Sequence, residues 1–100
     1  MKTKVGVAWY SPQGWGELRA IAPDADKLEA SYEEWVEVVE RGLADLRRAG
    51  LQPQRVEIAI APFVAWCDRM GRRPDAAARA AYVAEQLQAL QGPGAEHRDA

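Results

Sequence analysis

The sequence predicts a small α/β (or α+β) domain with the element order strand, helix, helix, strand, helix, helix. Two short segments rich in β-forming residues, 5–10 and 55–60, are each followed within two residues by a proline. The stretches after them carry apolar residues at three- and four-residue steps, as amphipathic helices do. Because two helices separate the strands, the connection is long enough for parallel pairing. We therefore expect a compact two-layer fold with a small parallel two-stranded sheet.

The first strand is expected over Val5–Tyr10 and the second over Arg55–Ile60. Side chains alternate between the two faces of a strand, so Gly6 and Ala8 share one face of the first strand and make that face small. A small face lets another element approach the backbone closely.

The first two helices are expected to connect these strands. The first spans about Pro12–Ala22, with Ser11 as its N-cap residue and a proline at its first position, where a missing N–H costs nothing. The second spans about Lys27–Ala49 and ends at Gly50. Its apolar stripe consists of Leu28, Tyr32, Trp35, Val39, Leu43 and Leu46.

Two further helices are expected after the second strand. The third spans about Pro62–Met70, and the fourth begins after Asp75, its N-cap residue, and ends near Gln91. Residues 1–91 should form one globular domain, whereas 92–100 should be a disordered tail. The apolar stripe of the fourth helix consists of Ala76, Ala80, Val83, Leu87 and Leu90.

Composition limits the classes of partner. The formal net charge is −2, which argues against nucleic-acid binding because that requires clustered positive charge. The apolar run near the N-terminus is too short for a signal peptide or a membrane span. A single cysteine cannot form an internal disulfide bond, so a cytoplasmic location is expected.

Few residues are suited to catalysis. The chain has one histidine, His97, in the predicted tail, one cysteine, Cys67, in an apolar helix, and no asparagine. A nucleophile and its base must be held within hydrogen-bond reach on a rigid support. No Cys/His ligand set for a metal is present, and we expect neither a metal nor a cofactor.

The chain resembles a family of small uncharacterised bacterial proteins of about 100 residues. The residues that carry the resemblance are Val7–Tyr10, then Trp15, Leu18 and Ile21 at three-residue steps, then Asp24–Trp35, Phe63–Cys67, and Ala78-Arg79 before Tyr82-Val83. It would cover most of residues 5–90. The resemblance implies a freestanding bacterial cytosolic domain and no particular activity.

A ligand-binding edge is expected where the two strands end. In parallel units, ligands gather at the carboxyl ends of the strands, where helix N-termini direct free N–H groups outward. The predicted ligand-binding residues there are Tyr10, Ser11, Gln13 and Trp15. Arg79, on an alanine-rich helix, is added as an anion-binding candidate or as the partner of a carboxylate such as Asp75 or an acid of the second helix.

Self-association is the other expectation. Two strands cannot cover their own edges, which need either a second copy of the chain or burial under the long second helix, and four tryptophans are many for so small a core. We therefore predict a homodimer that covers a sheet edge or an aromatic patch, with Trp15 and Trp66 as interface candidates. The favoured function is a non-enzymatic module for self-association or for binding a protein partner. A small-molecule or anion binder is the alternative, and an enzyme using Tyr10, Arg79 and a carboxylate ranks last.

Overall fold

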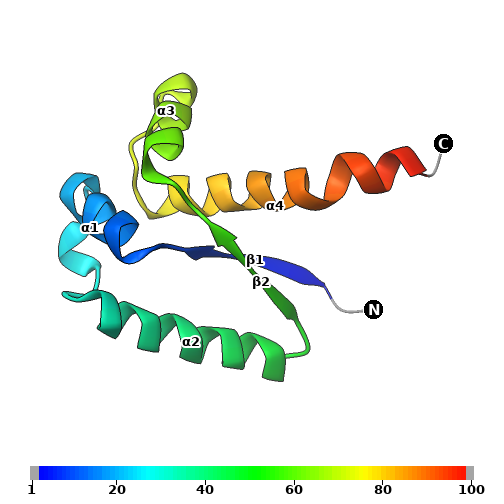
Figure 1. The fold of residues 1–100 in the computed structure, drawn as a ribbon, viewed down its shortest axis with the longest axis horizontal. Helices are drawn as coiled ribbons and strands as arrows, with labels where there is room; N and C mark the ends of the chain where they lie inside the picture. The colour runs from blue at the N-terminus through cyan, green and yellow to red at the C-terminus, as the bar shows by residue number, and fades with distance from the viewer. Residues whose placement is uncertain (1–2, 99–100) are drawn as a thin grey trace.

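The computed structural model describes the backbone of residues 3–98 and the side chains of residues 3–90. It confirms the predicted α/β (or α+β) class, with α+β as the better description, and the predicted order of elements (Figure 1). The strands β1 (Lys4–Trp9) and β2 (Gln52–Glu57) pair in parallel, with Lys4 opposite Gln52 and Trp9 opposite Glu57. The helices are α1 (Pro12–Ile21), the 3-10 turn η1 (Ala25–Lys27), α2 (Tyr32–Arg48), α3 (Ile60–Met70) and α4 (Ala76–Arg98).

The sheet lies between α2 and α4, which cover opposite faces of it (Figure 1). On one face, the Trp9 ring packs against Trp35 of α2, with ring centroids 5.0 Å apart. On the other face, Gly6 lies against Val83 and Leu87 of α4. The small face of the first strand therefore admits a closely packed helix, as its residues predict.

Helix α2 begins at Tyr32, five residues later than expected. Its start is set by a capping box in which Ser31 accepts from the Glu34 backbone N–H at 3.1 Å, while the Glu34 carboxylate accepts from the Ser31 N–H. Residues before this cap form η1 and a short extended link that carries Leu28 to the core. The part of the predicted stripe that lies in α2 faces inward, with Trp35 and Leu43 buried.

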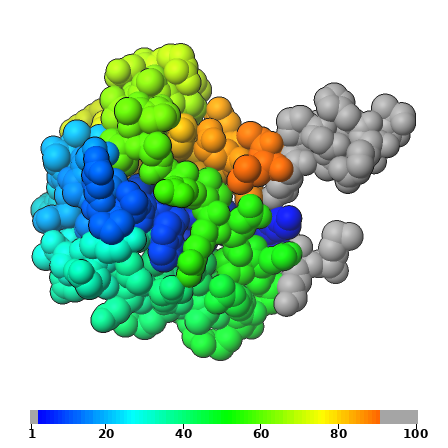
Figure 2. Space-filling view, viewed as in Figure 1, coloured from blue at the N-terminus to red at the C-terminus, as the bar shows by residue number. Residues whose placement is uncertain are grey.

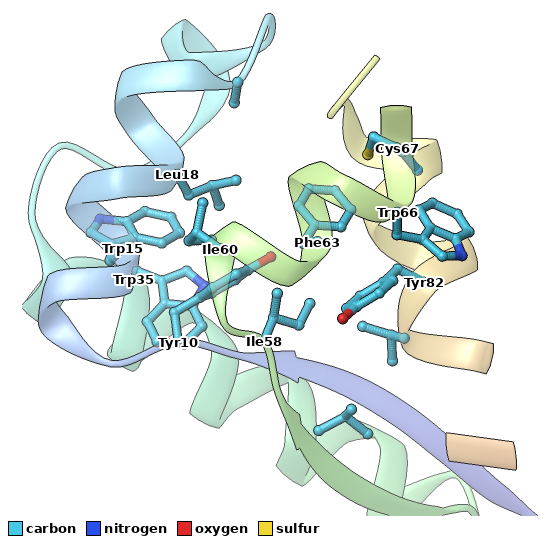
Figure 3. Close-up of a cluster of buried hydrophobic side chains, with 14 residues drawn as sticks. Tyr10, Trp15, Leu18, Trp35, Ile58, Ile60, Phe63, Trp66, Cys67 and Tyr82 are labelled. Carbon is cyan, nitrogen blue, oxygen red and sulfur yellow. The ribbon is translucent and has the colours of Figure 1, made fainter. Parts of the chain in front are cut away.

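The second strand is displaced from its expected position, and α3 begins earlier than expected. The prediction of Arg55–Ile60 rested on three alternating apolar residues, but β2 ends at Glu57 and α3 begins at Ile60. At Ile58 the chain leaves the sheet and turns toward α3, so the side chains of Ile58 and Ile60 are buried in the core (Figure 3). Their alternation therefore reflects burial and does not mark a strand. Pro62 falls within the first turn of α3, where no N–H is needed.

The buried face of α4 also differs from the prediction. Ala78, Tyr82 and Val83 are buried, whereas Ala76, Ala80 and Leu90 are exposed. Alanine contributes little apolar area, so the large ring of Tyr82 decides which side of the helix turns inward. The helix continues beyond Gln91 to Arg98. The side chains of the expected tail, 92–100, lie outside the described residues, so its predicted disorder stays a prediction.

The core lies at the carboxyl ends of the strands, where α1 and α3 meet α2 and α4 (Figure 3). Phe63 and Leu18 are among its most deeply buried side chains. Cys67 is also buried there, which raises the pKa of its thiol. Within the described part of the chain, no helix is long and apolar enough to cross a membrane.

Candidate functional site

A groove of about 1110 Å³ runs along the outer edge of β1. The residues of β1 from Lys4 to Ala8 form its floor. Helix α2 contributes Val38, Val39 and Leu46 to its lining, and α4 contributes Ala80, Ala84 and Leu87. Apolar side chains dominate both walls, and Val38 is 42% exposed. The groove is therefore an apolar channel whose floor is a β-strand.

The floor of the groove carries polar backbone groups. The Gln52 N–H donates to the Thr3 carbonyl at 2.9 Å, and the Ile58 N–H donates to the Trp9 carbonyl at 2.9 Å. In a parallel pair, the N–H and C=O groups of alternate residues face the neighbouring strand. The backbone N–H and C=O groups of the odd-numbered residues of β1 thus point toward β2. The N–H and C=O groups of Lys4, Gly6 and Ala8 face the groove, where no strand among residues 3–98 pairs with them.

The far end of this edge is closed by a side chain. Tyr10 is the next residue in the alternation, and its carbonyl accepts a hydrogen bond from the Tyr32 hydroxyl at 2.8 Å. This bond places the start of α2 beside the carboxyl end of β1. The unpaired stretch in the described chain therefore comprises three residues, with Gly6 at its centre.

The outer edge of β2 is protected against strand pairing. By the same alternation, its outward-facing residues are Pro53, Arg55 and Glu57. Pro53 has no N–H to donate, and charged side chains on an edge discourage pairing. Arg55 stacks over the Trp9 ring, with its guanidinium carbon 4.1 Å from the ring centroid, and pairs with Glu40 at 2.9 Å. This edge lies on the side of the molecule shown in Figure 2. The two edges of the sheet are thus built differently.

Three of the predicted ligand-binding residues line one end of the groove: Tyr10, Trp15 and Arg79. Tyr10 and Trp15 are each only 3% exposed, and their rings lie 5.8 Å apart within an aromatic cluster that includes Trp35 (Figure 3). Burial raises the pKa of Tyr10 to about 12, so its hydroxyl stays protonated at neutral pH. The Trp15 indole N–H is buried without a hydrogen-bond partner among the described residues.

The other two predicted ligand-binding residues make local contacts and do not line the groove. The Ser11 hydroxyl accepts from the Gly14 N–H at 3.0 Å, which is the N-cap role expected of it. The Gln13 amide donates to Glu17 at 3.2 Å on the exposed face of α1. The five predicted residues therefore do not converge on one site.

Arg79 is held by a carboxylate that the sequence analysis did not name. Its guanidinium donates two hydrogen bonds to Asp24, at 2.8 and 3.0 Å, and a third to the Pro74 carbonyl at 3.2 Å. Asp24 is neither of the expected partners: it precedes the second helix, and Asp75 instead caps α4 by accepting from the Ala78 N–H at 2.9 Å. These bonds hold the pKa of Asp24 below its usual value. Arg79 is thus engaged within the chain, which weakens its candidacy as an anion receptor.

The two predicted interface tryptophans lie inside the single chain. Trp15 is 3% exposed, and Trp66 is 5% exposed and stacks on Phe63. The Trp66 indole N–H donates to Glu85 at 3.2 Å, which ties α3 to α4. An interface that uses these rings would require rearrangement of the core. The sequence analysis did not single out the outward-facing backbone groups of Lys4, Gly6 and Ala8. A proline occurs in β2 but not in β1, and this difference could have indicated that the outer edge of β1 is the one able to pair.

No model of a known protein family matches the chain, and neither curated proteins nor solved structures include a significantly similar one. Within the described residues, no three His, Cys, Asp or Glu side chains gather as a metal site would require. The interpretation of the site therefore rests on its geometry.

Proposed function

We propose that the protein is a non-enzymatic, self-associating module and that a homodimer interface forms at the groove along β1. One observation carries the proposal: three N–H and three C=O groups on the outer edge of β1, which no strand among residues 3–98 pairs with, lie at the floor of an apolar groove. An unpaired edge is a template for pairing with another chain. The outer edge of β2 is protected against such pairing, and this contrast supports the outer edge of β1 as the site of association.

The charges that line the groove are complementary to those of a second copy of the chain. Four charged residues line it, of which Arg79 is paired with Asp24 and Glu85 accepts from Trp66. The other two, Lys4 and Glu29, stand toward opposite ends, since the chain from η1 to α2 lies beside the carboxyl end of β1. Two copies related by a two-fold axis place each lysine toward the end of the partner's groove that holds the glutamate.

The size of the molecule also supports self-association. A standard interface buries about 800 Å² on each partner, which is about one-eighth of the 6491 Å² that the chain exposes. The molecule measures 45 × 35 × 20 Å, so one broad face can supply that area. A two-fold interface requires only one self-complementary patch. In the cytosol that we propose as its location, the buried Cys67 would stay reduced and take no part.

Light scattering after gel filtration tests the proposal with two matched variants. We expect the wild type at micromolar concentration to have a mass of about 22 kDa, twice the 11.1 kDa of the chain. Val38→Glu should reduce the mass to that of one chain, because the interface would bury an unpaired charge. Ile21→Glu is the control, since Ile21 is 40% exposed, much like Val38 at 42%, but lies on α1 outside the groove.

The masses decide between the possible outcomes. A wild type that elutes at the mass of one chain throughout would overturn the proposal. A dimer that persists in Val38→Glu and dissociates in Ile21→Glu would move the interface away from the groove. Because both side chains are substantially exposed, the variants should fold, and far-ultraviolet circular dichroism checks that they do.

A further inference from the structure

The arrangement of backbone groups on β1 specifies how two copies would meet. We propose that the segment entering the groove is β1 of the second copy, paired antiparallel about a two-fold axis at Gly6. This inference rests on the proposed self-association and names the partner strand and its register. The two sheets would then join into one sheet of four strands.

The register follows from which groups are free. The outward-facing residues are Lys4, Gly6 and Ala8, and the Tyr10 carbonyl beyond them is already bonded to Tyr32. In an antiparallel ladder, each hydrogen-bonded residue pair exchanges two N–H···O=C bonds. Pairing Gly6 with Gly6 of the partner, and Lys4 with Ala8 of the partner in both directions, satisfies every one of these groups. A shift of two residues one way brings the Tyr10 carbonyl, already bonded to Tyr32, into the ladder, and a shift the other way places Ala8 opposite a residue outside the described range.

The side chains at the groove accommodate this arrangement. Residues directly opposite each other in an antiparallel pair share a face. The α4 helices of both copies therefore lie on the face of Gly6 and Ala8, and the α2 helices lie on the other face. Pairing would bring the two β1 strands to about 4.8 Å from each other. Helices that pack together keep their axes about 8–10 Å apart, so bulky side chains between the two α4 helices would hinder this approach. The short side chains of Ala80 and Ala84 on the groove wall allow the closest helix approach.

Opposite charges favour the antiparallel sense. Lys4 lies at the amino end of β1, and Glu29 lies beside its carboxyl end. Antiparallel pairing brings Lys4 of each copy toward the Glu29 end of the partner. Parallel pairing would instead place the two lysines together and the two glutamates together, which is unfavourable.

Disulfide cross-linking reads the register directly. Val5 and Val7 face away from Gly6 and Ala8, and the proposed register places Val5 of one copy opposite Val7 of the other, in a pair without hydrogen bonds. The Cα atoms of such pairs are about 4.5 Å apart, within the range of a disulfide bond. The variants Val5→Cys and Val7→Cys are made in a Cys67→Ala background, which removes the native thiol.

We expect an equimolar mixture of the two variants to form a covalent dimer under mild oxidation, and either variant alone to remain uncross-linked. Cross-linking of Val5→Cys alone would place the axis at Val5, and cross-linking of Val7→Cys alone would place it at Val7. Either result overturns the register. A dimer by light scattering that cross-links in no combination shows that another segment enters the groove. A mass of one chain by light scattering contradicts self-association itself, so the two proposals fail separately.

Ala8→Pro provides a second measurement. Its ring would occupy the groove side of the strand and remove one outward N–H without breaking a bond to β2. We expect this variant to have the mass of one chain. Glu57→Pro, which removes an outward N–H from the protected edge of β2, should remain a dimer. A dimer in both variants would contradict pairing along β1.

Discussion

The ion pair between Asp24 and Arg79 joins two segments that are 55 residues apart in the chain. Its side chains are 20% and 12% exposed, respectively, so the pair is mostly shielded from water. The hydrogen bonds from Arg79 are the main reason that the pKa of Asp24 lies below its usual 3.8. The pair anchors the start of α4 to the chain that follows α1, and so fixes one end of the groove.

Replacing this carboxylate should change stability in a pH-dependent way. In the unfolded chain Asp24 has its ordinary pKa, so the pair stabilises the folded state above that pH, and this contribution is lost as the pH falls through the lowered pKa. We expect Asp24→Asn to cost roughly 1.5–3 kcal/mol at pH 7, the range for hydrogen bonds to charged groups. Its free energy of unfolding should approach that of the wild type below about pH 4.

The exposed pair of Asp45 and Arg48 supplies the control. These side chains are 68% and 73% exposed. Asp45→Asn should change stability by less than about 1 kcal/mol. Urea melts between pH 3 and 7 measure both variants. Equal effects of the two substitutions, or a difference for Asp24→Asn that is independent of pH, would contradict the role given to the shielded pair.

At the scale of secondary structure, the packing of α4 on β1 depends on one missing side chain. A Cβ atom at Gly6 would lie 2.8 Å from Cγ1 of Val83 and 3.4 Å from Leu87. Either the Val83 side chain or the helix itself would have to shift to make room for it. The glycine therefore allows the helix to cover this face of the sheet and to form one wall of the groove.

Two glycine-to-alanine substitutions should act in opposite directions. We expect Gly6→Ala to cost roughly 1–3 kcal/mol, because overpacking shifts the backbone or forces strained rotamers. Gly42→Ala, in α2, meets nothing within 4 Å and should stabilise the protein by about 0.5–1 kcal/mol, since alanine suits a helix interior better. Denaturant melts at pH 7 measure both. A Gly6→Ala variant as stable as the wild type would mean that α4 does not press on β1.

At the scale of the whole molecule, the two edges of the sheet present different surfaces. Pro53 and the charged side chains of Arg55 and Glu57 protect one edge. The other edge lies in an apolar groove, with its backbone groups free within the described chain. A two-stranded sheet is marginal alone, so an additional pair of strands would stabilise it.

Linkage between folding and association should make thermal stability depend on concentration. If the folded state is a dimer, a 100-fold increase in protein concentration favours it by about 1.4 kcal/mol per chain. For a domain of this size, the midpoint temperature should then rise by roughly 5 °C or more between 1 and 100 μM. Calorimetry at several concentrations measures the shift. Val38→Glu should melt at one temperature throughout, and a wild type that does the same would contradict the dimer.

Local patterns in the sequence by themselves determined much of this protein. The alternation in β1 predicted its small face, and Ser11 and Asp75 were correctly assigned as helix caps. The apolar stripe of α2 identified Trp35 as a core residue, and the long helical connection predicted parallel strands. The caps, the small face and the stripe depend on residues within a few turns of one another, where steric and capping preferences act directly, and the parallel sense follows from the length of the connection.

Only the tertiary structure decided the features that make up the groove. The bounds of β2, the side of α4 that is buried, and the choice of Asp24 as the partner of Arg79 each join segments that are distant in sequence. The register between β1 and β2 then sets which backbone groups face outward. Local propensity is nearly the same for neighbouring registers and for different faces of an alanine-rich helix. The packing of large side chains such as Tyr82 and Phe63 makes the selection, because the observed arrangement buries both rings against each other.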